Sequence, residues 1–262
     1  MSDRVKTALV LGPVFLAVLL LGGVAVFGVL VALVAGVGAW EARRLACPDA
    51  NALEELFVAG WGGVIALSFL SRSGAVPGAL LALGVLVYLG AWAFGPGPGP
   101  DTLRRWGAAA GAWLLVALFL GHAIWVRRYG IAPVLFLLGV VWAGDTAAYY
   151  TGRALGATAL APAVSPKKTL EGSAGGFVAA VAVAGVFSVL LPVPHSLGTG
   201  LLWGAVLNLV AQTGDLLESL LKRCAGVKDS GALFPGHGGV LDRVDGFLPT
   251  LPLYAAILGL GG

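Results

Sequence analysis

A chain of 262 residues that is 58% hydrophobic and only 11% charged has too few polar side chains for an ordinary soluble domain, and its mean hydropathy of +0.93 points to a membrane protein. Two cysteines are too few for a disulfide framework or a zinc site, so we expect Cys47 and Cys224 to be free thiols. The net charge of +3 requires no nucleic-acid partner, because basic residues that set membrane topology and attract anionic headgroups account for it.

Apolar stretches able to cross about 30 Å of hydrocarbon recur along the whole chain. The sequence therefore predicts an all-α, polytopic integral membrane protein of about nine transmembrane helices, with Gly22 and Gly23 separating the first two. A cleaved signal peptide is the alternative for the N-terminus, but the apolar run continues too far and no clear small-residue cleavage site follows. The predicted spans are 7–21, 24–40, 56–70, 76–94, 107–126, 131–150, 172–191, 200–221 and 247–261.

The positions of Lys and Arg test this scheme, because basic residues accumulate in cytoplasmic loops. With a cytoplasmic N-terminus, 13 of them fall on the inner side and three, Arg72, Arg127 and Arg128, fall on the outer side. We therefore expect a cytoplasmic N-terminus and an outer C-terminus.

The acidic residues divide the chain into two predicted domains. Residues 1–130 form membrane helices without recognisable chemistry, which we interpret as a scaffold. Residues 131–262 contain three acidic stretches, each at or beside the cytoplasmic end of a predicted helix, so we expect a catalytic half with one shared site. The acidic residues of this half are Asp145, Glu171, Asp215, Glu218, Asp229, Asp242 and Asp245.

The first stretch, "WAGDTAAYYTGRALG" (142–156), spaces Asp145, Tyr149 and Arg153 four residues apart, so that they share one helical face. An intramembrane Asp faces the bundle interior or a wet cavity. Pairing of Asp145 with Arg153 is the structural alternative.

The second stretch, "SPKKTLEGSAGG" (165–176), places two lysines beside a helix start. We expect Pro166 to end regular structure and Thr169 to be able to cap the following helix. Free amides, the helix dipole and the ammonium groups of Lys167 and Lys168 together favour a phosphate. A topology-setting basic anchor is the alternative.

The third stretch, "NLVAQTGDLLESLLKR", carries one polar stripe with steps of four, three, four and three residues. Such a stripe is too costly to face lipid, so we expect it to line a cavity; polar contacts between helices are the alternative. Glu218 lies slightly off the stripe. The stripe consists of Asn208, Gln212, Asp215, Ser219 and Lys222.

The loop that follows, "KDSGALFPGHGGVLDRVD" (228–245), is rich in charge and glycine. Glycines around His237 would let backbone amides approach a ligand. Asp242 and Asp245 are three residues apart, so one helical turn would put both carboxylates on one side. Carboxylates from two elements beside several Lys and Arg residues are the ingredients of a magnesium-nucleotide site.

Residues 219–245 resemble the signature of the phosphatidate cytidylyltransferases, also called CDP-diacylglycerol synthases. The two upstream stretches resemble that family's other motifs, in the same order. The specific resemblance covers about 140–250, whereas for the N-terminal half it rests on length and hydropathy alone. The matching signature positions are Ser219, Lys222, Arg223, Lys228, Asp229, Pro235, His237, Gly238, Gly239, Asp242, Arg243 and Asp245.

This resemblance implies that CTP and phosphatidic acid react to give CDP-diacylglycerol and pyrophosphate, with Mg²⁺ bound by Asp215 and Asp242 and with Asp245 as a third carboxylate beside them. It assigns triphosphate and phosphatidate oxygens to the basic residues Lys167, Lys168, Lys222 and Arg223. Lys228, Asp229 and the turn of His237, Gly238 and Gly239 would shape the nucleotide pocket, with Arg243 and Ser219 beside them and Asp145 as a candidate for metal or cytidine contact.

The resemblance also implies a homodimer in the bacterial inner membrane, and it leaves room for a second, monovalent cation. The positions of Lys and Arg predict that the site faces the cytoplasm. Two rival functions remain open at the level of sequence. One is a CTP-dependent enzyme acting on another lipid phosphate or on a polyprenol. The other is a transporter for an anionic solute, which the concentration of chemistry in one half and on one face disfavours.

Overall fold

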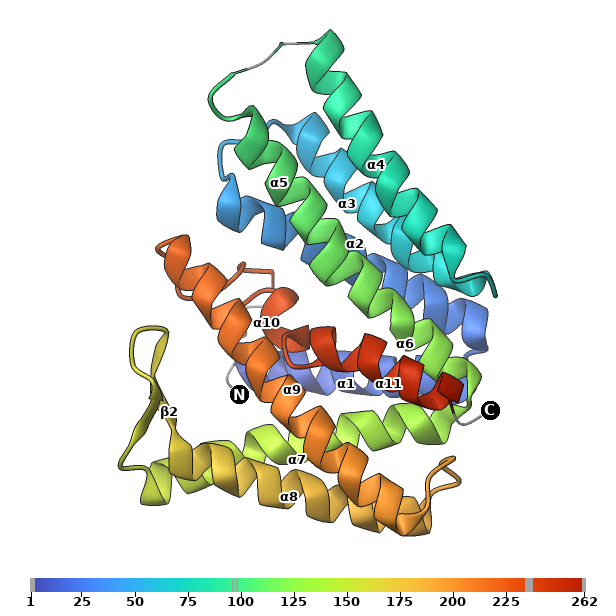
Figure 1. Ribbon diagram of the computed structural model, residues 1–262, viewed down its shortest axis with the longest axis vertical. Coiled ribbons are helices and arrows are strands. Elements are labelled where there is room, and N and C mark those ends of the chain that lie inside the picture. The colour runs from blue at the N-terminus through green and yellow to red at the C-terminus, as the bar shows by residue number, and fades with distance from the viewer. Residues whose placement is uncertain (1–2, 96, 98, 234–237, 261–262) are drawn as a thin grey trace. The chain divides into compact units, whose positions relative to one another are not determined.

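The computed structural model describes residues 3–95, 97, 99–233 and 238–260, and most of these residues are helical (Figure 1). The chain forms two compact units. The first comprises Met1–Trp125 together with Asp229–Arg243, and the second comprises Val126–Lys228 together with Val244–Gly262. The first unit therefore contains a short segment that lies far from the rest of it in sequence.

The first unit is a helical bundle in which α2 is central. This helix packs against α3, α5 and the π-helical segment η2, and α3 also contacts α4. The side chain of Trp113 is fully buried among these helices, and its indole N–H donates to the carbonyl of Val58 at 2.9 Å. The elements are α1 (Asp3–Leu21), α2 (Val24–Ala46), α3 (Ala52–Leu67), η1 (Ser68–Leu70), α4 (Ala75–Phe94), α5 (Thr102–Ala112), η2 (Trp113–Leu118) and the start of α6 (Phe119–Arg128).

The second unit combines long helices with a small β-hairpin. Helix α8 packs against α7 and α9, and α11 packs against α9. The two strands pair antiparallel, with Ala161 opposite Ser165. The elements are α7 (Ile131–Leu155), β1 (Ala159–Ala161), β2 (Ser165–Thr169), α8 (Leu170–Leu190), α9 (Leu197–Cys224) and α11 (Phe247–Leu260), and the short helix α10 (Leu241–Val244) begins in the first unit and ends in the second.

Helices α7 and α8 approach each other closely because small residues line their contact. A Cβ atom added at Gly172 would lie 2.8 Å from the carbonyl oxygen of Ala148, and one added at Gly176 would lie 2.7 Å from that of Gly144. Glycine is therefore required at both positions, as is typical of helix pairs in membranes. The close contact holds the C-terminal part of α7, which the sequence predicts to be at the cytoplasmic side, beside the start of α8.

These elements confirm the predicted all-α membrane protein. Six of the described helices or runs of helices are long and apolar enough to cross a membrane: 24–46, 52–70, 75–94, 102–128, 131–155 and 170–190. Helix α9 is not among them because its polar stripe lowers its hydropathy. The count of nine spans and the orientation of the N-terminus stay predictions.

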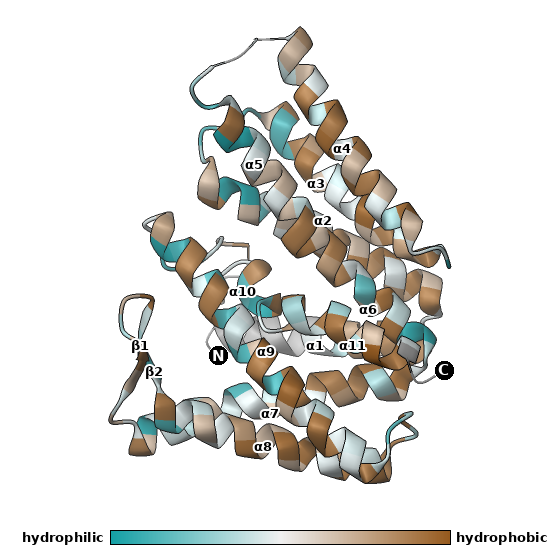
Figure 2. Cartoon of the chain, viewed as in Figure 1, coloured by the Kyte–Doolittle hydropathy of each residue, from teal (hydrophilic) through white to brown (hydrophobic). Residues whose placement is uncertain are grey.

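The predicted boundaries are close to the observed ones, with one clear exception. Gly22 and Gly23 separate α1 from α2 as expected, and both cysteines are free. The expectation that Pro166 ends regular structure is wrong, because Pro166 lies inside β2. Figure 2 shows apolar residues along most helices and hydrophilic residues gathered at one end of α2, α3 and α5.

Candidate functional site

The N-terminal part of the polar stripe on α9, Asn208 and Gln212, contacts the neighbouring helix α8. Gln212 accepts a hydrogen bond from the hydroxyl of Ser173 on α8, and its amide group donates to the carbonyl of Ser173 at 3.2 Å and to Asn208 Oδ1 at 2.6 Å. Asn208 itself is fully buried. This part of the stripe therefore acts as polar contact between helices, the alternative that the spacing had left open.

The C-terminal part of the stripe, from Asp215 onward, carries charge. Asp215 on α9 forms an ion pair with Lys168 on β2, with 2.5 Å between Asp215 Oδ2 and Lys168 Nζ. Both side chains are partly exposed, at 34% and 27%. The pair joins two of the three predicted stretches, so Lys168 and the stripe meet as the sequence indicated.

Asp245 lies between α10 and α11 and belongs to the same unit as Asp215. Burial and repulsion from the Asp215 carboxylate raise the pKa of Asp245 to about 7, with a smaller contribution from Asp145 on α7. Asp145 also interacts electrostatically with Asp215 and Lys168. Three carboxylates from three separate parts of the second unit therefore lie within electrostatic range of one another.

The last turns of α9 position two further basic residues. Lys222 pairs with Glu218, which is buried, and Ser219 beside it is buried as well. Arg223 donates to the carbonyl of Val227 at 2.8 Å and to that of Val164, in the hairpin turn, at 3.3 Å. The predicted phosphate ligand Arg223 thus also ties the hairpin to the end of α9.

The hairpin leads directly into α8. The hydroxyl of Thr169 accepts a hydrogen bond from the amide of Gly172 at 3.1 Å, which confirms the predicted helix cap. The carboxylate of Glu171 accepts from the amides of Ala157 and Thr158 at 3.1 and 3.2 Å, and it fixes the entry to the hairpin. Lys167 lies exposed on β2 next to Lys168, two residues before the N-cap Thr169, and adjacent residues of a strand point to opposite faces.

The segment Asp229–Arg243 belongs to the first unit, and Asp242 organises it. Asp242 Oδ2 accepts hydrogen bonds from the amide and hydroxyl of Ser230, at 2.9 and 2.8 Å, and from the amide of Gly239 at 2.8 Å. Gly238 adopts a φ of +76°, which favours glycine, and a Cβ there would lie 2.5 Å from the same carboxylate oxygen. The conformation of the segment therefore depends on both glycines.

A second carboxylate holds this segment, and the sequence did not point to it. Glu41 on α2 is 1% exposed, and it accepts hydrogen bonds from the amides of Val240 and Leu241 at 3.0 and 2.8 Å. The Ser230 hydroxyl oxygen lies 3.3 Å from Glu41 Oε2. The amides from Gly239 to Leu241 are thus engaged by protein carboxylates and are not available to a phosphate. A single Glu near the end of an apolar helix was the one signal of this role.

The remaining predicted residues are less closely tied to the site. Lys228, Asp229 and Arg243 lie at the surface. His237 lies outside the described residues. Asp242 and Asp245 are three residues apart in the chain but belong to different units, so the grouping of Asp242 with Asp215 stays a prediction.

The second unit has suitable donors for a divalent cation. Asp145, Asp215 and Asp245 repel one another, and a cation would relieve that repulsion as well as accept their oxygens. Across the described residues, His, Cys, Asp and Glu side chains form no ready-made set of three metal ligands. Mg²⁺ takes one or two protein carboxylates and completes its shell with phosphate oxygens and water.

Comparison with known proteins agrees with this chemistry. A model described as "Cytidylyltransferase family" matches residues 2–260. A phosphatidate cytidylyltransferase of Brucella suis biovar 1 is 38% identical over 274 residues, covering 100% of this chain and 93% of the relative. Proteins of the same name from Bacillus subtilis and Staphylococcus epidermidis are 40% identical over 153 residues and 43% identical over 132 residues; these matches cover 56% and 50% of this chain, and 57% and 51% of the relatives.

The extent of these matches identifies the family. The family model spans nearly the whole chain, and the Brucella protein is similar along all of it. The carboxylates and lysines described above lie within the matched region. The chain belongs to the cytidylyltransferase family.

Proposed function

We propose that this protein transfers the cytidylyl group of CTP to phosphatidate, which gives CDP-diacylglycerol and pyrophosphate. The observation that carries the proposal is the Lys168–Asp215 ion pair beside Asp145 and Asp245, in a chain that matches the cytidylyltransferase family from end to end. A carboxylate suited to a cation and an ammonium group suited to a triphosphate therefore lie together at the middle of the polar stripe. The names of the similar proteins support phosphatidate as the acceptor.

In the proposed reaction, a phosphate oxygen of phosphatidate attacks the α-phosphorus of CTP. A new P–O bond forms there while the bond from the α-phosphorus to the oxygen bridging it to the β-phosphorus breaks, and pyrophosphate leaves. The nucleophile is already an anion, so no Ser, Cys or His nucleophile is required. Positioning and charge neutralisation are the main tasks of the protein.

The residues of the second unit suit these tasks. We assign Asp215 and Asp245 to Mg²⁺, which would neutralise triphosphate charge when bound. Lys168 neutralises Asp215 in the free protein, and on nucleotide binding its ammonium group would turn to phosphate oxygens. Lys222 and Lys167 would hold further phosphate oxygens. Asp242 remains a candidate ligand from its place in the signature.

We further propose that the protein lies in the bacterial inner membrane with this site on the cytoplasmic side. The distribution of Lys and Arg, 13 inside and three outside in the predicted topology, supports this orientation. CTP would then reach the site from the cytosol while phosphatidate enters from the bilayer. A homodimer and a second, monovalent cation stay proposals that rest on family resemblance alone.

The decisive experiment uses purified protein with CTP labelled at its α-phosphate, Mg²⁺ and a panel of lipid phosphates and polyprenols. We expect label to enter the lipid fraction with phosphatidate, together with release of unlabelled pyrophosphate, and we expect chelation of Mg²⁺ to stop both. Transfer to another lipid phosphate alone, or absence of transfer by well-folded protein, would contradict the proposal.

A further inference from the structure

Glu41 is a buried carboxylate in the N-terminal helices, where the sequence shows no recognisable chemistry. Burying an ionised group is costly unless hydrogen bonds or an opposite charge compensate it. Arg43, two residues further along α2, does not compensate it, because Arg43 pairs with Glu54 at 2.5 Å and donates to the carbonyl of Cys47. The described hydrogen bonds of Glu41 all come from the segment Asp229–Arg243, so the charge of Glu41 and the position of that segment depend on each other.

From this geometry we propose that Glu41 is a positioning residue for Asp242 in the cytidylyl transfer. The inference rests on the function proposed above and adds a residue from the N-terminal helices to the catalytic machinery. Glu41 acts through the backbone of the segment. It holds the amides of Val240 and Leu241, which directly precede Asp242 in the chain.

Ser230 connects the two carboxylates. Its hydroxyl donates to Asp242 Oδ2 at 2.8 Å and lies 3.3 Å from Glu41 Oε2, and its amide also donates to Asp242. Glu41 therefore acts on Asp242 through the adjacent backbone, and the Ser230 hydroxyl contacts both carboxylates. Shared partners of this kind make the orientation of one carboxylate sensitive to the other.

The fit around Glu41 leaves little room for adjustment. A Cβ atom added at Gly231 would lie 2.5 Å from Glu41 Oε1, and one at Gly239 would lie at the same distance from that oxygen. The segment thus surrounds the carboxylate with glycine on two sides. The approach of this one side chain explains Gly231 and Gly239, which lie 190 and 198 residues after Glu41 in the chain.

The test compares Glu41→Gln with the matched control Glu54→Gln. Both replace a carboxylate of the first unit by an amide of the same shape, but Glu54 binds Arg43 and Arg105 and not the segment. In Glu41→Gln the amide nitrogen would face a backbone N–H, so one hydrogen bond is lost and two donors oppose each other. The control variant Glu54→Gln therefore shows how a general loss of stability affects hydrogen exchange and the Mg²⁺ dependence of activity.

Two measurements distinguish positioning from stability. We expect hydrogen exchange in peptides containing Val240 and Leu241 to become at least tenfold faster in Glu41→Gln and to stay at the wild-type rate in Glu54→Gln. We also expect Glu41→Gln to raise the Mg²⁺ concentration for half-maximal activity at least tenfold, while Glu54→Gln leaves it unchanged. Unchanged exchange in Glu41→Gln, or equal effects of the two variants, overturns the proposal.

Ser230→Ala keeps the proposal testable if Glu41→Gln does not accumulate in membranes. This variant removes only the hydroxyl that contacts both Glu41 and Asp242. We expect hydrogen exchange in the same peptides to become several-fold faster. An unchanged rate would refute the proposal that these contacts hold the segment. Hydrogen exchange needs no substrate. If the wild-type protein fails to transfer label from CTP, the proposed function falls while the exchange data still decide whether Glu41 holds the segment.

Discussion

Asp215 is the residue on which the proposed chemistry depends most directly. It pairs with Lys168, it interacts with Asp145 and Asp245, and it belongs to the polar stripe of α9. A substitution of Asp215 is expected to weaken the proposed cation site, whereas a substitution of its partner Lys168 is expected to strengthen cation binding.

Asp215→Asn is expected to lower turnover by about 100-fold or more, because it removes a negative charge from the proposed cation site while preserving shape. Asp101→Asn is the matched control, since Asp101 is an exposed carboxylate paired with Arg104 at 3.2 Å. We expect the control to keep wild-type activity. Label transfer from CTP to phosphatidate measures both, and near-wild-type turnover of correctly inserted Asp215→Asn would remove Asp215 from the site.

Lys168→Gln is expected to bind Mg²⁺ several-fold more tightly in the absence of CTP, because the competing ammonium group is gone from Asp215. The same variant should lose affinity for CTP, since the lysine no longer neutralises phosphate. The rise in melting temperature on adding Mg²⁺ reports cation affinity, and KM reports the nucleotide. Lys168→Arg keeps the charge and should show a wild-type response to Mg²⁺; a similar response from Lys168→Gln would argue against competition at Asp215.

At the scale of elements, the junction between β2 and α8 links stability to binding. Thr169 caps α8 directly after Lys168, whereas Ser196 caps α9 with a bond of 3.2 Å from the Thr199 amide. The two caps are equivalent in type, but only the first lies beside the proposed phosphate ligands.

Thr169→Ala and Ser196→Ala should each destabilise the protein by about 1 kcal/mol, the usual effect of losing a cap. We expect Thr169→Ala alone to raise KM for CTP, because it loosens the strand end that positions Lys168. Thermal unfolding in detergent and steady-state kinetics measure the two effects. Equal KM values for the two variants would show that the cap serves stability only.

The elements also show how far the sequence could predict the structure. The steps of four and three residues placed Asn208, Gln212 and Asp215 on one face of α9, because helical periodicity is a local property. The hairpin was missed because its strands are short and because Pro166 usually signals a break. The helix cap at Thr169 could also be predicted from the local sequence.

Glu41 could not be predicted in the same way. Its partners Ser230, Val240 and Leu241 lie 189 to 200 residues further along the chain, and no local pattern encodes such a contact. The same reasoning covers Gly239, for which the sequence suggested room for a phosphate. The structure shows that the approaching group is a carboxylate of the protein itself.

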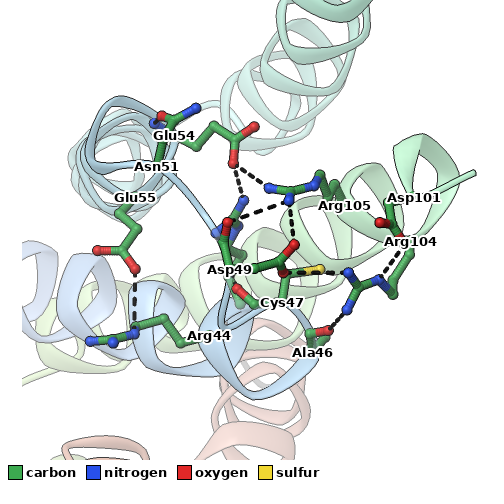
Figure 3. A network of polar contacts seen from close by, with 11 residues as sticks. Arg44, Ala46, Cys47, Asp49, Asn51, Glu54, Glu55, Asp101, Arg104 and Arg105 are labelled. Atoms are coloured by element: carbon green, nitrogen blue, oxygen red, sulfur yellow. Dashed lines mark hydrogen bonds and ion pairs between the residues drawn. The ribbon is translucent and has the colours of Figure 1, made fainter. Parts of the chain in front are cut away.

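At the scale of the molecule, a network of charges holds α2, α3 and α5 together at one end of the first unit (Figure 3). Glu54 binds Arg43 and Arg105, and Arg105 also pairs with Asp49 at 2.5 Å. Arg43 is fully buried, whereas Asp49 is about half exposed. The buried and exposed parts of the network should therefore differ in their contribution to stability.

Glu54→Gln is expected to destabilise the protein by about 3 kcal/mol, because it leaves the buried guanidinium of Arg43 without its charge partner. Asp49→Asn should change the melting temperature little, since solvent replaces an exposed partner. Thermal unfolding of both variants in the same detergent provides the comparison. Equal melting temperatures would mean that burial of Arg43 is compensated in another way.

The accessibility of a native cysteine can test the proposed membrane orientation. Cys224, at the end of α9, is exposed, whereas Cys47 is fully buried. A membrane-impermeant maleimide should therefore label Cys224 in inverted vesicles and not in right-side-out ones. Cys224→Ser should abolish labelling. Labelling from the outer side would reverse the proposed topology.

The path of the chain between the two units has a consequence for how the protein can be divided. The chain leaves the second unit after Lys228, contributes fifteen residues to the first, and returns at Val244. A fragment starting at residue 126 would contain the entire signature but lack Glu41, the carboxylate that binds it. Such a fragment would lack the carboxylate that binds the amides of Val240 and Leu241, so we expect a split version of the protein to be active only when both fragments are in the same membrane.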